Sequence, residues 1–148
     1  MKISFYILFI AFSFINVLSA NENSYYLILK NNEVNVRYGP GFDYPIKYVY
    51  KKKNLPVKVI DKKENFKKII DFKKNSGWIH ASQLKKGKSF ILLKDQILFT
   101  KPTKYSKPLF IVAKGRLLLV KKCKKNWCRV KTGNFLGWIK TNEIWGLY

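Results

Sequence analysis

The sequence predicts an all-β protein built from two small β-barrels in tandem. Three observations carry this prediction: short apolar runs, turn-forming residues between those runs, and an internal repeat of roughly 60 residues. No convincing helical periodicity follows residue 20. Evenly spaced short strands with regular turn signals are typical of small barrels or sandwiches.

The expected strands alternate or cluster apolar residues over a few positions. They are Tyr26–Leu29, Leu55–Ile60, Phe66–Phe72, Gly77–His80, a stretch around Leu117–Val120, Cys128–Lys131 and Gly137–Lys140. The turn signals between them are Gly39-Pro40-Gly41, Asn75-Ser76-Gly77, Lys86-Gly87, Lys114-Gly115 and Thr132-Gly133-Asn134. Residues that reverse the chain therefore separate most of the expected strands.

The repeat defines the domain organisation. The segment Leu55–Ile69 aligns without gaps with Arg116–Val130, and in both repeats a Gly-Trp-Ile sequence follows, at Gly77 and at Gly137. The predicted barrels span residues 25–86 and 89–148. A repeat of this length is just large enough to fold by itself.

The N-terminus has the pattern of a secretory signal peptide over residues 1–20. Lys2 precedes an apolar run from Ile3 to Ile15, and small residues follow at Ser19 and Ala20. An uncleaved membrane anchor is the alternative, but the run is short and no basic residues close it. We therefore expect a periplasmic or secreted protein, and export argues against a role on chromosomal DNA.

Positive charge dominates the composition, with 30 Lys and Arg against 8 Asp and Glu and a formal net charge of +22. Loss of residues 1–20 would remove Lys2 and no acidic residue, which leaves +21. Attraction to an anionic envelope or membrane surface, nucleic-acid binding and low-GC codon usage all explain such a charge. Arginine, which reads guanine edges, occurs only at positions 37, 116 and 129, so no specific nucleic-acid partner is expected.

Lysine runs occur where turns or strand ends are predicted, and we interpret them as solvated surface that also discourages pairing between strand edges. The runs are Lys51-Lys52-Lys53, Lys73-Lys74, Lys85-Lys86 and Lys121-Lys122.

The two cysteines, Cys123 and Cys128, predict a disulfide because an even cysteine count in an exported chain favours pairing. The closed loop is small, so the bond is worth only ~2 kcal/mol and would pin a hairpin. A tetrahedral metal site needs more ligands than two cysteines and the distant His80. Neither a metal nor a cofactor is expected.

Several motifs resemble the bacterial SH3 domain, a small five-stranded barrel. They are Asn35-Val36-Arg37, Gly39-Pro40-Gly41, the strand Leu55–Ile60, Phe66 and Gly77-Trp78-Ile79. The whole chain from about Tyr25 onward also resembles a two-domain alphaproteobacterial exported family, through Asn35–Tyr50, Cys123–Val130 and Glu143–Gly146. Asn54 stands where such domains often have glycine, as Gly115 does in the second repeat; asparagine tolerates the left-handed backbone conformation.

The first repeat carries a loop that the second has lost in sequence. Ile97–Pro102 aligns with Asn35–Pro40 but keeps only the proline. Folding alone therefore explains the side chains of the first loop least well. The candidate ligand-binding residues are Arg37, Tyr38, Asp43, Tyr44, Tyr48, Trp78 and His80.

Each candidate also has a structural interpretation. Arg37 either clamps a ligand carboxylate or pairs with Asp43 across the turn. Trp78 recurs as Trp138, which favours packing, and His80 is expected near a barrel edge. Val36 and Ile46 are expected to face the core. Trp145 is expected to fold back and close its barrel.

No paired carboxylates, Cys-His pair or Ser-His-Asp set is brought together by the sequence, so we expect no enzymatic activity. The resemblance implies a non-catalytic binding module of the cell envelope, with peptidoglycan or its stem peptides as the leading ligand. A periplasmic protein–protein adaptor that does not contact the wall is the alternative.

Overall fold

The computed structural model describes residues 24–147, and these form strands with a single 3-10 helix, η1, at Ala81–Gln83. The first set of strands is β1 (Tyr25–Leu29), β2 (Val34–Arg37), β3 (Ile46–Tyr50), β4 (Pro56–Lys63), β5 (Phe66–Ile70), β6 (Ser76–His80) and β7 (Leu84–Lys85). The second is β8 (Ser89–Leu92), β9 (Gln96–Phe99), β10 (Pro108–Val112), β11 (Leu117–Lys124), β12 (Trp127–Thr132), β13 (Phe135–Lys140) and β14 (Ile144–Trp145).

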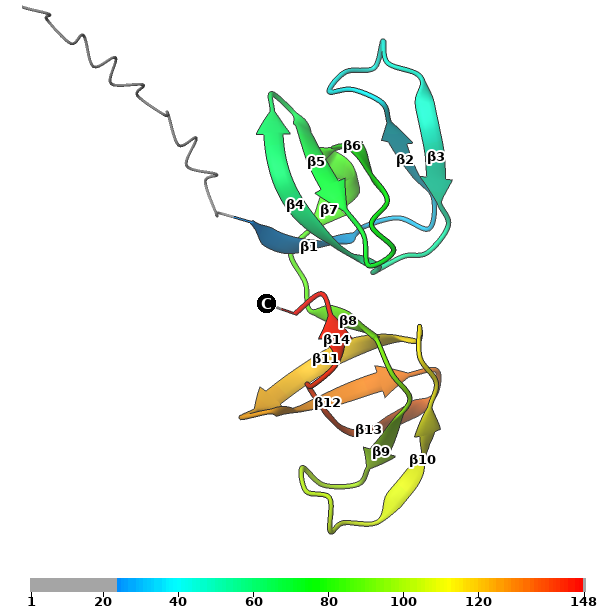
Figure 1. Cartoon of the computed structure of the whole chain (residues 1–148), viewed down its shortest axis with the longest axis vertical. Helices are drawn as coiled ribbons and strands as arrows, with labels where there is room; N and C mark the ends of the chain where they lie inside the picture. The colour runs from blue at the N-terminus through cyan, green and yellow to red at the C-terminus, as the bar shows by residue number, and fades with distance from the viewer. Residues whose placement is uncertain (1–23, 148) are drawn as a thin grey trace, which may run out of the picture.

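The two sets have the same topology. The first sheet has the order β3-β2-β6-β5-β4-β1-β7, and the second has the order β10-β9-β13-β12-β11-β8-β14. Every strand of the second sheet therefore occupies the place of the strand seven positions earlier. Each sheet curls around its own apolar core, so the predicted all-β fold of two tandem SH3-like barrels is confirmed (Figure 1).

Alternation along the strands places one face inside each barrel. In β6, Gly77 and Ile79 are buried while Trp78 and His80 are half-exposed, and β13 repeats the pattern. Val36 is buried as expected, but Ile46 is 46% exposed, so that prediction was wrong. A bulge between Val36 and Arg37 shifts the register, which sets Ile46 opposite Arg37 and on the outward face.

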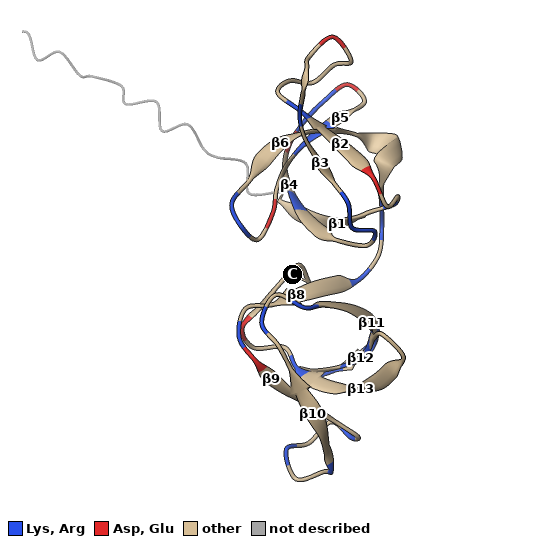
Figure 2. Ribbon diagram, turned by 90° about the vertical axis from the view of Figure 1, so that its right-hand side faces the viewer, with Lys and Arg blue, Asp and Glu red and all other residues tan. Residues whose placement is uncertain are grey.

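The turns follow the backbone chemistry that the repeat predicted. Asn54 has φ of 63° and its counterpart Gly115 has φ of 79°, so asparagine does replace glycine in a left-handed position. Basic residues occur in both barrels, in strands as well as in loops (Figure 2). One lysine run differs from expectation, because Lys121-Lys122 lies inside the long strand β11.

A disulfide joins Cys123 to Cys128, as predicted. These residues face each other across the β11–β12 hairpin, one residue pair before its turn. The bond therefore pins the far end of one hairpin and connects no distant parts of the fold.

The two barrels meet along β1 and β4 on one side and β8 and β14 on the other (Figure 1). The Ser89 hydroxyl, which is fully buried, donates to the carbonyl of Asn54 over 2.7 Å. Ile91 of the second barrel belongs to the core cluster of the first. The contact between barrels is thus apolar packing joined by a buried hydrogen bond.

Trp145 does more than close its own barrel. Its strand β14 pairs with β8, but its indole packs against the first barrel's core and meets the Tyr26 ring edge-on at 5.5 Å. The predicted signal peptide, residues 1–20, lies outside the described residues. Within residues 24–147 there is no helix with the length and apolarity needed to span a membrane.

Candidate binding surface

The predicted ligand-binding residues come from three adjacent strands and the loop between two of them. Arg37 ends β2 and lies opposite Trp78 of β6, and His80 ends the same strand. Tyr38, Asp43 and Tyr44 lie in the loop that joins β2 to β3, while Tyr48 lies in β3 itself. The sheet order β3-β2-β6 makes these strands neighbours.

Arg37 and Tyr44 hold the β2–β3 loop in shape. The Tyr44 ring packs against Gly39 and Gly41. It approaches Gly39 so closely that a β-carbon on this residue would collide with the ring. The Arg37 guanidinium donates to the carbonyl oxygens of Tyr44, over 2.8 Å, and Phe42, over 3.3 Å. Among the described residues Arg37 forms no ion pair with Asp43, so the loop backbone, and not the carboxylate, is its partner.

Phe42, an aromatic residue of the first loop that was not among the candidate ligand-binding residues, is the exposed centre of an aromatic cluster. Its side chain is 67% exposed, yet its ring lies 5.3 Å from Phe66 and 5.2 Å from His80. The Arg37 guanidinium lies 5.4 Å from the same ring. An aromatic residue that folding fixes but does not bury is typical of a recognition surface.

His80 has a structural role within this cluster. Its Nδ1 accepts a hydrogen bond from the backbone N–H of Ser82 and so caps η1. Its ring also lies 5.1 Å from Phe66. The cap and the ring contact together fix the orientation of the imidazole beneath Phe42.

The structure does not bring Tyr48 to this cluster. Tyr48 packs against the core and its hydroxyl lies 3.3 Å from that of Tyr50, which donates to Asp71 over 2.9 Å. Burial raises the pKa of Tyr50 well above its ordinary value, and its hydrogen bonds to Tyr48 and Asp71 add to the effect. Burial likewise raises the pKa of Tyr48. These phenols are therefore structural groups that stay protonated.

The second barrel keeps the loop that its sequence seemed to have lost. Tyr38 N–H donates to the Pro45 carbonyl over 3.2 Å, and Thr100 N–H donates to the Lys107 carbonyl over 3.1 Å. Both loops have the same length, and both contain a second backbone hydrogen bond, between residues two positions apart. The conclusion that the second barrel lacks this loop was therefore wrong for the backbone and holds only for the side chains.

Different side chains hold the two loops. Ser106 takes the place of Tyr44, and its hydroxyl donates to the carbonyls of Lys101 and Thr103. Ser106 stabilises this backbone conformation through hydrogen bonds, whereas Tyr44 stabilises it by packing against glycine. Folding thus accounts for Arg37 and Tyr44 but not for the exposed Tyr38, Phe42 and Asp43.

The corresponding place on the second barrel is an open groove of about 340 Å³. Lys104 stands where the first barrel has Phe42, Trp127 replaces Phe66, and Lys140 replaces His80. Phe99 and Trp127 meet edge-on at 5.6 Å, and the Lys140 ammonium lies 5.7 Å from the Trp127 ring. Both barrels therefore combine aromatic rings with cations on the same outward face.

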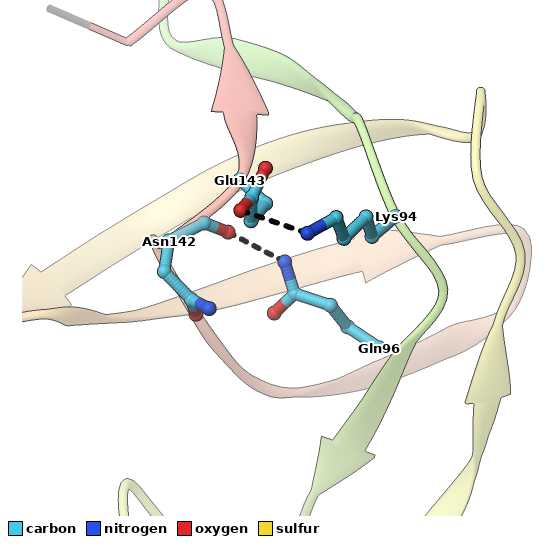
Figure 3. Close-up of polar contacts among 4 residues, drawn as sticks. All are labelled: Lys94, Gln96, Asn142 and Glu143. Carbon is cyan, nitrogen blue, oxygen red and sulfur yellow. Dashed lines mark hydrogen bonds and ion pairs between the residues drawn. The ribbon is translucent and has the colours of Figure 1, made fainter.

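Polar contacts fix one end of this groove (Figure 3). The Gln96 amide donates to the Asn142 carbonyl over 2.6 Å, and the Lys94 ammonium lies 3.1 Å from the Glu143 carboxylate. Gln96 and Asn142 line the groove. Among the described residues, no group of three or more His, Cys, Asp or Glu could hold a metal ion.

The shared loop backbone leads to a prediction. Consider a variant in which residues 38–45 carry the sequence of residues 100–107, with the three lysines of that sequence changed to glutamine. Its free energy of unfolding should lie within about 1 kcal/mol of the parent value. Both sequences satisfy the same backbone bonds, so the barrel should not need one of them in particular. Urea denaturation followed by circular dichroism measures the difference. A loss of several kcal/mol would instead make the first loop's side chains necessary for folding.

The family to which this chain belongs is decided by a match that covers most of both barrels. The bacterial SH3 domain family matches residues 30–86 and 94–146. The chain belongs to the bacterial SH3 domain family. The two family segments of this bacterial SH3 domain protein correspond to the two seven-stranded sheets.

Among solved structures, the bacterial SH3 domain protein is similar to NlpC1 and NlpC2 from Trichomonas vaginalis, each at 12% sequence identity. The NlpC1 match covers 86% of this chain and 47% of that chain with a TM-score of 0.39; the NlpC2 match covers 82% and 47% with a TM-score of 0.37. The chain spans about half the length of these proteins. No curated protein matches it.

Proposed function

We propose that this bacterial SH3 domain protein is a non-catalytic binding protein of the cell envelope that recognises peptidoglycan or its stem peptides. The observation that carries the proposal is Phe42, an exposed ring held between Arg37, Phe66 and His80. Tyr38 lies in the same loop and is 62% exposed. Exposed aromatic faces stack on sugar rings, and adjacent cations attract the carboxylates of an acidic peptide.

The proposal places the protein outside the cytoplasm and assigns it no catalytic step. Family membership supports the envelope location. The high positive charge also supports it, because long-range attraction raises the rate of encounter with an anionic wall. The wall ligand would contact the Phe42 surface first, with the groove beside Trp127 as a second point of contact.

Sedimentation with purified peptidoglycan tests this function. The chain from residue 21 onward should pellet with peptidoglycan at physiological ionic strength, and the neutral loop replacement at 38–45 should remain largely in the supernatant. Low salt gives no information, because a chain of net charge +21 adheres to any polyanion. A parent protein that stays soluble with peptidoglycan at physiological salt would refute wall binding.

An adaptor function is the second candidate, and one apolar surface favours it. Ile111 of the edge strand β10 is 68% exposed and lies directly opposite Ile97 of β9, which is also exposed. Leu109 of the same edge strand is exposed as well. Apolar side chains along a sheet edge suit a protein partner better than a sugar polymer. Failure to pellet with the wall would leave the adaptor function standing.

A further inference from the structure

A second, separate groove of about 340 Å³ lies between the two barrels. The turn before β4 forms one wall, with Lys52, Lys53 and Asn54. The start of β11 and the β12–β13 turn form the other wall and the floor, through Arg116, Leu117, Leu119, Lys131, Thr132 and Gly133. Neither barrel alone contains this groove.

Four cations line the groove and no acidic residue does. Lys52, Lys53, Arg116 and Lys131 are all exposed. Among residues 24–147 the ion pairs are Lys51–Glu33 and Lys94–Glu143, and no side-chain hydrogen bond involves any of the four cations. Like charges gathered in a concave site focus a positive potential that only an external anion can neutralise.

The junction between the barrels fixes the two walls relative to each other. Asn54, which lines the groove, accepts the buried hydrogen bond from Ser89 of the second barrel. Trp145 packs on Tyr26 at the same junction. The cations of the two walls are therefore held on a preformed frame, which lowers the entropic cost of binding.

The chemistry of the floor selects among anions. Leu117 and Leu119 are half-buried aliphatic residues, and Asn54 and Thr132 offer polar side chains beside them. A nucleic-acid backbone brings phosphates but no aliphatic side chains to pack on these leucines. A flat membrane surface cannot follow a concave groove. A peptide with carboxylates and small aliphatic side chains complements the lysines, the leucines and the polar groups together.

We propose that the groove between the barrels binds an acidic peptide, with Lys52 and Lys53 on one wall and Arg116 and Lys131 on the other contacting its carboxylates. This site is distinct from the Phe42 surface and does not depend on wall binding.

Fluorescence anisotropy with a labelled peptide of alternating alanine and glutamate, at physiological ionic strength, tests this site. The variant Lys52→Gln/Lys53→Gln/Arg116→Gln/Lys131→Gln should bind the peptide about tenfold more weakly or worse, since four ion pairs are lost. The matched control Lys62→Gln/Lys63→Gln/Lys121→Gln/Lys124→Gln loses the same charge outside the groove and should bind nearly as the parent does.

Two half variants, Lys52→Gln/Lys53→Gln and Arg116→Gln/Lys131→Gln, should each weaken binding, because the site needs both walls. Equal weakening in the groove variant and the matched control would overturn the proposal and leave only general charge attraction. Tighter binding of a thymidine oligonucleotide than of the peptide, sensitive to the same four positions, would also overturn it. The assay contains no cell wall, so its outcome is independent of the sedimentation result.

Discussion

Replacing Asp71 with alanine should lower the free energy of unfolding by about 3 kcal/mol and the melting temperature by roughly 10 °C. Asp71 is only 3% exposed and carries a carboxylate. Its Oδ1 accepts from the backbone N–H groups of Lys73 and Asn75, and its Oδ2 accepts from the Asn75 amide and the Tyr50 hydroxyl. Alanine would leave these four donors without the acceptor that holds them in a partly buried network.

The β5–β6 loop explains why one carboxylate matters so much. In the second barrel the turn between β12 and β13 consists of Gly133 and Asn134 alone. Backbone pairing between these two strands therefore continues almost to the end of the hairpin. The first barrel needs the longer segment from Asp71 to Asn75, whose backbone the carboxylate holds as a substitute for strand pairing. The carboxylate thus replaces backbone bonds that a shorter turn would have supplied.

Thermal and urea denaturation measure the effect, and Asp61→Ala is the matched control. Asp61 is an exposed carboxylate of β4 that caps only the backbone N–H of Lys62. Its removal should change stability by no more than about 0.5 kcal/mol. Similar losses in the two variants would mean that the Asp71 network contributes no more than an ordinary surface cap.

Repeat comparison predicted most of the fold because the two barrels share their inward positions. Gly77 and Gly137 are buried at matching places, and Asn54 and Gly115 adopt matching left-handed conformations. Each of these features is local to one repeat. A sequence pattern therefore carries enough information to place it.

The candidate surface was harder to predict, because one backbone shape can be held by unlike side chains. The packing of Tyr44 on Gly39 and the hydrogen bonds of Ser106 have no resemblance in sequence, yet they hold equivalent loops. The alignment therefore overstated the difference between the loops. The candidate list also included Arg37, whose guanidinium binds the loop backbone, and left out Phe42, which the fold leaves exposed.

The junction was invisible to a comparison of repeats. A repeat comparison aligns one barrel with the other, so contacts between the two barrels produce no repeated pattern in the sequence. Trp145 was expected to serve its own barrel, and only the three-dimensional arrangement shows it against Tyr26. The groove lined by Lys52 and Arg116 was missed for the same reason.

A Gly146→Ala substitution should lower the free energy of unfolding by roughly 2–3 kcal/mol and loosen the contact between the barrels. Gly146 has φ of 116°, a conformation that residues with a β-carbon rarely adopt. A β-carbon there would also lie 2.5 Å from Cβ and 2.6 Å from Cγ of Pro56 in the first barrel. The C-terminal segment would have to shift, and the adjacent Trp145 would lose its place against Tyr26.

Loss of that contact should uncouple the two barrels. The parent should unfold in one cooperative transition, because Ile91 and Trp145 extend the core of the first barrel into the second. The Gly146→Ala protein should instead show two separate thermal transitions and a larger radius of gyration by small-angle X-ray scattering. The acidic-peptide groove, which needs both walls in place, should weaken in the same variant.

Gly133→Ala is the matched control. It distinguishes the effect of backbone strain from the effect of the collision at the junction between the barrels. Gly133 also has a positive φ, of 57°, but a β-carbon there would have no atom within 4 Å. It should cost only about 1 kcal/mol and leave the single transition and the radius of gyration unchanged. If Gly146→Ala behaves in the same way as Gly133→Ala, the C-terminal segment does not hold the barrels together. A compact, singly cooperative Gly146→Ala protein would lead to that conclusion even if its melting temperature fell, because strain alone lowers stability without separating the domains.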